Sequence, residues 1–130
     1  MKNIHTLILP LLATLLLSCR TPQPQNSSST SPVSHITLAV TCSDPTMFFT
    51  GTIVRDGNIR QVSGTGSGTF DITGNEIVAS FKKSGAKGRI SIEGSEAGVK
   101  LGNASTDRNA GGVRAEFHRT PAVQQGFSSF

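Results

Sequence analysis

Few side chains in this sequence can act as nucleophiles or as acid and base groups. The 130 residues include two cysteines, Cys19 and Cys42, and three histidines, of which His5 lies in an apolar leader. Nucleophilic catalysis needs a nucleophile, a base and a group that orients the base. The remaining histidines, His35 and His118, lie near opposite ends of the expected domain, and no spacing joins them to such a set. We therefore expect a protein that is not an enzyme.

Two glycine-rich segments invite a ligand-binding interpretation. Residues 64–68 (GTGSG) lack the Gly-Lys-Ser/Thr ending of a phosphate loop and precede a predicted strand instead of a helix. Residues 107–112 (DRNAGG) offer two oxygen-bearing side chains with an arginine between them, whereas calcium takes about six to eight oxygens. We expect a flexible connection at the first segment, and neither a metal nor a cofactor at either.

One hairpin concentrates positive charge. Lys82, Lys83, Lys87 and Arg89 fall within nine residues, and each basic side chain close to an anionic membrane surface contributes about 1 kcal/mol. The hairpin is a candidate contact for anionic lipid head groups, or else a solvated turn that blocks association of sheet edges. The formal net charge is +4, or about +3 without Lys2 of the leader, which is too little to indicate nucleic acid binding.

The first 18 residues have the features of an export signal. A short basic start precedes the mostly apolar residues 4–17, which Pro10 interrupts. This stretch is shorter than the roughly 18 to 20 apolar residues that cross a bilayer as a helix, and it matches the apolar region of a secretory signal. We predict a signal peptide over residues 1–18.

The end of the leader resembles the bacterial lipobox, because Leu16-Leu17-Ser18-Cys19 has an aliphatic residue, then a small residue, then the cysteine. The resemblance implies cleavage between Ser18 and Cys19 and attachment of acyl chains such as palmitate to Cys19, which would anchor the protein in the membrane. Arg20 follows in the place where some bacteria use aspartate to retain lipoproteins in the inner membrane, so the resemblance points to the outer membrane. The alternative is an ordinary signal peptide with a chance cysteine.

Residues 19–34 are rich in proline, serine and glutamine without apolar periodicity, which predicts a flexible, disordered tether. Lipidation of Cys19 would leave Cys42 without an intramolecular partner, so the domain would have no disulfide. We expect Cys42 to be a buried, inert thiol, because no histidine or lysine neighbours it in the sequence to lower its pKa.

Residues 35–119 repeat a short alternation of apolar and polar residues followed by a turn signal, such as Asp56-Gly57 or Gly74-Asn75. Seven or eight such strands, each with one apolar face, need a second sheet to cover that face. We predict an all-β fold, an antiparallel immunoglobulin-like β-sandwich, followed by a loose C-terminal tail over 120–130 or at most an edge segment. The expected inward residues are Ile36, Leu38, Val40, Met47, Phe49, Ile53, Phe70, Ile72, Ile77, Ala79, Phe81, Ile90, Ile92, Ala97, Val99, Leu101, Val113, Ala115 and Phe117.

The layout of leader, tether and strand domain resembles small bacterial envelope lipoproteins with immunoglobulin-like sandwiches. Residues 36–73 are also faintly similar to the opening strands of the MmpS-type transport accessory proteins. That family usually has an uncleaved membrane helix and a cysteine pair, which this chain lacks, so no site residue is transferred from it.

These features predict a lipid-anchored protein of the bacterial cell envelope. We expect it to act as a non-enzymatic binding or accessory module for another envelope component, with the membrane, an envelope protein or anionic lipid head groups as partners. The alternative is a carrier of small molecules or lipids with a barrel-like cavity. A core filled by Phe49, Phe70, Phe81 and Phe117 would exclude the carrier, and an empty apolar cavity of about 300 Å³ or more would support it.

Overall fold

The computed structural model describes residues 33–85, 87–119 and 124–130. The predicted leader, the cleavage site at Ser18 and Cys19, and the tether up to residue 32 lie outside them. In the described residues every element is a strand, and none is a helix long and apolar enough to cross a membrane. The nine strands are β1 (Ser34–Cys42), β2 (Phe48–Arg55), β3 (Asn58–Thr65), β4 (Ser67–Gly74), β5 (Glu76–Lys83), β6 (Ile90–Glu96), β7 (Val99–Thr106), β8 (Gly112–His118) and β9 (Gln124–Ser129).

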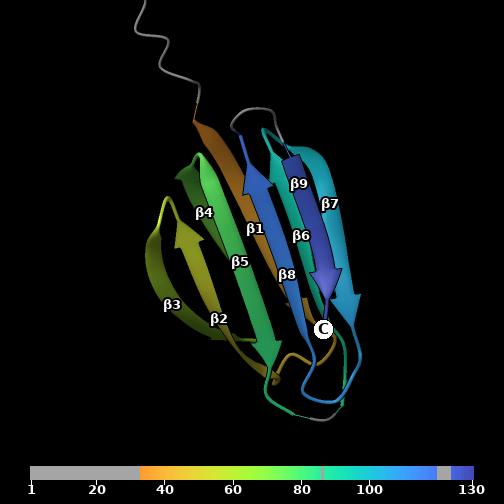
Figure 1. The fold of residues 1–130 in the computed structure, drawn as a ribbon. Coiled ribbons are helices and arrows are strands. Elements are labelled where there is room, and N and C mark those ends of the chain that lie inside the picture. The colour runs from red at the N-terminus through yellow and green to blue at the C-terminus, as the bar shows by residue number, and fades with distance from the viewer. Residues whose placement is uncertain (1–32, 86, 120–123) are drawn as a thin grey trace, which may run out of the picture.

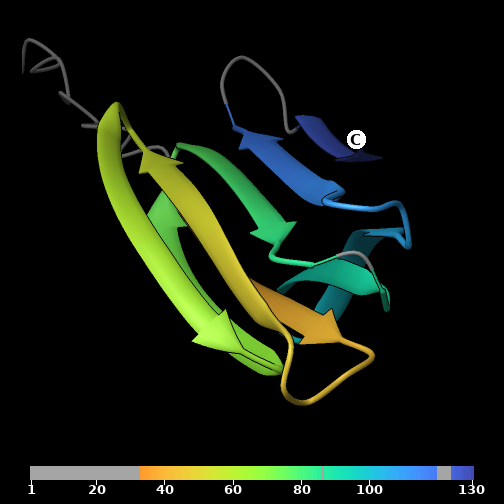
Figure 2. The ribbon, with the colours of Figure 1, turned by 90° about the horizontal axis from the view of Figure 1, so that it is seen from below.

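The strands form two antiparallel sheets that pack face to face, which confirms the predicted all-β sandwich (Figures 1 and 2). The four-stranded sheet has the order β4-β1-β6-β7, and the five-stranded sheet has the order β3-β2-β5-β8-β9. Along one side of the sandwich the edge strands β7 and β9 lie against each other. Along the other side β3 and β4 diverge, and the β2–β3 hairpin curves away from the rest of the molecule (Figure 1).

The connections follow part of the immunoglobulin order. In that fold the B and E strands pair in one sheet and the C and F strands pair in the other. β1, β4, β2 and β5 take these four places in turn. The chain then departs from the immunoglobulin order, because β6 returns to the first sheet beside β1 and β8 takes the place beside β5.

The strand count and the C-terminal segment differ from the main expectation. The strands number nine instead of seven or eight, and residues 124–129 form an edge strand, which is the alternative to a loose tail that the sequence left open. Residues 124–129 form β9, which pairs with β8 from Gln124 to Ser129. The Phe130 amide and carbonyl both bond to Gly112, at 3.0 and 2.9 Å. Phe127 anchors this strand by packing against Phe117, which fits the edge segment offered as the alternative.

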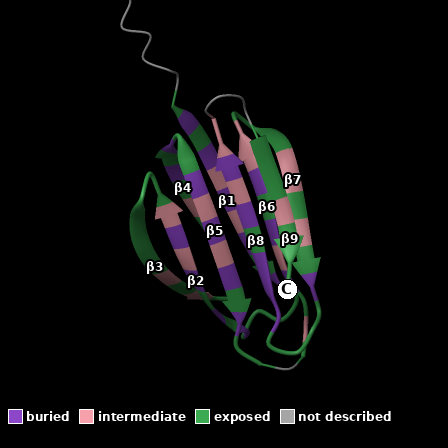
Figure 3. Ribbon diagram, viewed as in Figure 1, coloured by how far each residue is buried: buried purple, intermediate pink, exposed green. Residues whose placement is uncertain are grey.

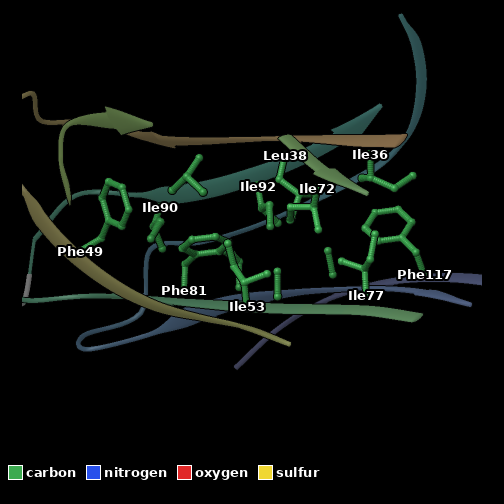
Figure 4. Close-up of a cluster of buried hydrophobic side chains, with 14 of the residues drawn as sticks. Ile36, Leu38, Phe49, Ile53, Ile72, Ile77, Phe81, Ile90, Ile92 and Phe117 are labelled. Carbon is green, nitrogen blue, oxygen red and sulfur yellow. The ribbon is translucent and has the colours of Figure 1, made fainter. Parts of the chain in front are cut away.

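Burial alternates along the strands (Figure 3), and the buried side chains of both sheets meet in one core (Figure 4). Phe49 and Phe81 meet edge to face with ring centroids 6.0 Å apart, and Phe70 stacks on Phe81 at 5.2 Å. Phe117 instead packs against Phe127 at 5.5 Å. The core members are Ile36, Leu38, Val40, Cys42, Met47, Phe49, Ile53, Ile72, Ile77, Ala79, Phe81, Ile90, Ile92, Val113, Ala115 and Phe117.

The turns decide which strands pair. Asp56 and Gly57 both have positive φ, 47° and 80°, as a two-residue hairpin turn requires, and they join β2 to β3. Residues 97 and 98 form a similar turn between β6 and β7. The expected inward positions of Ala97 and Val99 are therefore wrong, and Val99 is 66% exposed.

Two other connections cross between the sheets. The expected turn at residues 74–75 links β4 to β5, which belong to different sheets. Residues 64–68 are not a flexible loop, because they are the end of β3, one connecting residue and the start of β4. That residue, Gly66, has a φ of 72°, and its amide donates to the Met47 carbonyl at 2.8 Å.

Candidate functional site

The basic hairpin expected at residues 82–89 is instead a connection between the two sheets, because β5 and β6 belong to different sheets. This basic connection is also not the uniform charged surface that the sequence suggests. Lys83 is 2% exposed, because it occupies an inward position of β5, opposite Phe49 of β2. Its ammonium group donates hydrogen bonds to the Gly88 carbonyl at 2.6 Å and the Asp107 carbonyl at 3.3 Å. The prediction that Lys83 contacts an anionic surface is therefore wrong, since its charge is used to hold two loops together.

The other three cations of this connection are exposed. Lys82 lies on the outer face of the five-stranded sheet, Lys87 lies in the loop, and Arg89 is 3.9 Å from the Asp107 carboxylate. The Arg89 backbone also bonds to Ser43, just beyond the last residue of β1. We call this the distal end of the sandwich, because β1 begins at the other end.

The tether would join the domain at the end where β1 starts, which we call the proximal end. Ser34 pairs there with Gly74, and Figure 1 shows that the chain enters this end of the molecule. A nine-residue strand is about 27 Å long. The basic connection at residues 82–89 therefore lies at the far end of the domain from the expected membrane anchor.

The groups that could do acid–base or nucleophilic chemistry are not brought together. His35 lies on the outer face of β1, 2.9 Å from the Thr73 hydroxyl, while His118 lies on the outer face of the other sheet near Glu76. Cys42 is buried, as predicted, and burial raises the pKa of its thiol. Among the described residues, no three metal-ligating side chains are grouped.

The interior between the sheets is filled where Phe49, Phe70 and Phe81 interlock. Phe117 fills the region beside β9 together with Phe127. The centre of the sandwich between the described strands is therefore occupied by the side chains around Phe81.

An open cleft lies at the proximal end, between the diverging strands β3 and β4. Its volume is about 300 Å³. The floor is apolar, formed by Ile53 of β2 and Ile72 of β4, which are 4% and 8% exposed. The rest of the lining is Ile59 and four polar residues, Arg55, Asn58, Arg60 and Asp71.

The strand register explains why arginine side chains line an apolar floor. Ile53 faces the opposite sheet, and its partner on β3 is Arg60, so the Arg60 side chain starts from the same inward face. Arg55 follows Ile53 by two residues and also starts from that face. Since β3 diverges from the four-stranded sheet, neither position is covered, and both side chains reach solvent.

Neither cleft arginine has a carboxylate partner. All eight Asp and Glu residues of the chain lie in the described part, and no ion pair there includes Arg55 or Arg60. The nearest carboxylate of the lining, Asp71, accepts a hydrogen bond from the Thr37 hydroxyl at 2.7 Å. The other carboxylates are engaged elsewhere: Asp44 with Thr46, Asp56 with the amides of residues 75 and 76, Glu76 with His118, Glu93 with Lys100, Glu96 with Arg119, Asp107 with Arg89 and Glu116 with Arg114.

Sequence reasoning missed this cleft, although the strand pattern contained a signal for it. Arg55 continues the inward series Phe49, Gly51 and Ile53, so its phase places it on the inward face although charged side chains are mostly exposed. Lys83 continues the inward series of β5 in the same way and is buried, so the phase alone does not separate an uncovered position from a covered one. The divergence of β3 from β4 had no counterpart in the local pattern. No protein family, curated protein or solved structure matches this chain.

Proposed function

We propose that this protein is a lipid-anchored component of a bacterial cell envelope, held in the outer membrane through acylated Cys19. In this proposal it acts as a non-enzymatic binding module that recognises another envelope component. The recognition site is the cleft between β3 and β4.

The observation that carries the proposal is the asymmetry of the sandwich. One side is closed by β7 against β9, whereas the other side holds an apolar-floored cleft with two arginines that no carboxylate neutralises. Charged side chains left without an opposite charge around a concave apolar surface are typical of ligand sites. The non-enzymatic character is supported by the positions of His35 and His118 on the outer faces of different sheets.

Mass spectrometry of the native product tests the anchor. We expect a mature chain that begins at Cys19, with a diacylglyceryl group joined to the Cys19 sulfur by a thioether and a third acyl chain joined to the new N-terminus by an amide. A product that retains residues 1–18, or one whose Cys19 is not acylated, would contradict this part of the proposal. Replacement of Cys19 by serine should release the protein from the membrane fraction.

Photocrosslinking in intact cells tests the binding surface. Asn58 lines the cleft on β3, is exposed and shares the inward face with Arg60, while Val99 on the edge strand β7 is 66% exposed. A photoreactive amino acid at position 58 should give a discrete crosslinked species that the same group at position 99 does not give. The same crosslinked products at both positions would show that the cleft is not the recognition site.

A further inference from the structure

We propose that the cleft between β3 and β4 binds a phosphate monoester that has an apolar substituent, with Arg55 and Arg60 on the phosphate and the apolar part over Ile53 and Ile72. This inference rests on the proposed binding function and names the ligand class of the same site. The proposed site for anionic groups is thus at the proximal end and not in the basic connection at residues 82–89.

The spacing of the two arginines suits one tetrahedral anion. Arg55 pairs with Asn58, and Arg60 lies two residues further along β3. Such diagonal neighbours on adjacent strands are about 7 to 8 Å apart, within reach of long side chains. Two guanidinium groups can therefore approach a single phosphate from two sides, and arginine binds phosphate through paired N–H donors. The Asn58 amide, in the same lining, can donate a further hydrogen bond.

Charge favours a phosphate monoester over a neutral ligand. A phosphate monoester has a charge of about −1.5 to −2 at pH 7, which matches the two cleft arginines. Asp71 is the one carboxylate in the lining, and it lies on the outer face of β4, where Thr37 binds it. The net charge of the lining side chains is therefore positive.

The apolar floor argues that the ligand is more than a free phosphate ion. Ile53 and Ile72 are almost fully buried yet line the cleft, and burying apolar surface of a ligand against them is favourable by about 25 cal/mol per Å². A cleft of about 300 Å³ has room for a phosphate and a short apolar group. Its place at the proximal end, beside the Ile36–Ile72 pair, puts it on the side of the domain that the tether would hold nearest the membrane.

Titration with hexyl phosphate tests the inference. The full chain, in a neutral maltoside detergent at low salt, is followed by amide resonances in ¹H–¹⁵N NMR spectra. We expect saturable shifts centred on Ile53, Asn58 and Ile72. Arg55→Gln and Arg60→Gln should each weaken binding about fivefold, which corresponds to about 1 kcal/mol per basic contact. Arg108→Gln, an exposed arginine at the distal end, is the matched control and should leave the affinity unchanged.

Three outcomes would overturn the inference. Equal losses in Arg60→Gln and Arg108→Gln would show a general charge effect. Binding of inorganic phosphate as tight as that of hexyl phosphate would identify a free phosphate site, and equal binding of hexyl glucoside would identify an apolar site without charge recognition. Should Arg60→Gln fail to fold, Arg60→Lys keeps the charge without the paired donors and should weaken binding by a smaller factor.

This experiment fails separately from the tests of the proposed function. A chain that binds hexyl phosphate but lacks acylation would overturn the anchor and retain the cleft. An acylated chain that gives the crosslink at position 58 but does not bind hexyl phosphate would retain the binding module and overturn the ligand class.

Discussion

Lys83 is the one charged side chain that is fully buried among the described residues, and its ammonium group joins two distal loops through carbonyl oxygens. Replacing it leaves the Gly88 and Asp107 carbonyls without that donor, and losing the partner of a buried polar group costs about 1 to 3 kcal/mol. We expect Lys83→Met to lower the free energy of unfolding by that amount in urea titrations followed by far-ultraviolet circular dichroism.

Lys82→Met is the control for this substitution, because Lys82 is the exposed neighbour and surface changes are usually within about 0.5 kcal/mol. Similar losses in the two variants would contradict the structural role of Lys83.

Cys42 makes stability depend on alkaline pH. Burial raises the pKa of its thiol, an effect that Lys83 partly opposes. The unfolded chain therefore gives up this proton more readily than the folded chain, so the stabilising contribution is complete below the unfolded pKa of about 8.5 and is lost as pH rises above it. The sequence has no tyrosine, which leaves Cys42 as the main titrating side chain in this range.

In a Cys19→Ser chain, in which Cys42 is the remaining thiol, we expect the free energy of unfolding to fall between pH 8 and pH 10. Cys42→Ala in the same background should flatten this decline. A free energy that rises with pH, or an equal slope in both chains, would count against the raised pKa.

At the scale of elements, aromatic rings seated on glycines close the sandwich. Gly94 and Gly102, on the neighbouring strands β6 and β7, leave space for the Phe127 ring of β9, and a Cβ at either position would strike it. The ring also meets Phe117 edge to face at 5.5 Å. The same arrangement recurs where Phe81 covers Gly51 and where the Phe130 ring covers Gly112.

Phe127→Ala should detach β9, because the other side chains of this strand are exposed. We expect a loss of about 2 kcal/mol, less than the 3 to 5 kcal/mol of a fully buried phenylalanine, and faster amide exchange over residues 124–129. Phe48→Ala, on a side chain that is 45% exposed, should cost less and leave exchange in β9 unchanged.

Gly102→Ala tests the same contact from the other side, since its new methyl group would displace the Phe127 ring. Gly126→Ala is the matched control, because a Cβ there meets nothing within 4 Å. If both variants were equally stable, the seat for Phe127 would not contribute to the closure.

At the scale of the whole molecule, the two ends of the sandwich have different surroundings. The chain enters at the proximal end, with the cleft, and the distal end holds the loops around Lys83 and the C-terminal residue (Figure 1). In the proposed function, the residues between Cys19 and β1 join a lipid anchor to the proximal end, which would hold this end nearer the membrane on average.

This orientation predicts a difference in quenching by spin-labelled lipids. In vesicles that contain the acylated protein, a fluorophore attached to Asn75→Cys, at the proximal end, should be quenched more than one attached to Lys87→Cys, at the distal end. Buried Cys42 should not compete for the label. Stronger quenching at position 87 would indicate the opposite orientation, with the basic connection at residues 82–89 as the membrane contact.

The sequence by itself determined most strands of this protein, though not β9. Strict alternation has a period of two, a local property, so the inward faces of β1, β5 and β8 could be assigned from their residues alone. The Asp56-Gly57 turn was equally local, because few residue pairs adopt its positive φ values. Alternation failed at Ala97 and Val99 because a turn and an outward residue interrupt the apolar phase there.

The tertiary structure alone decided what lies over each face. Whether a strand joins one sheet or the other depends on pairing between residues far apart in the chain, and nothing in residues 74–76 separates a hairpin from a crossing between sheets. Burial of Lys83 depends on carbonyls from two loops that meet it only after folding. The cleft exists because β3 lies at a sheet edge and diverges from β4, which leaves Arg55 and Arg60 on an inward face without a cover.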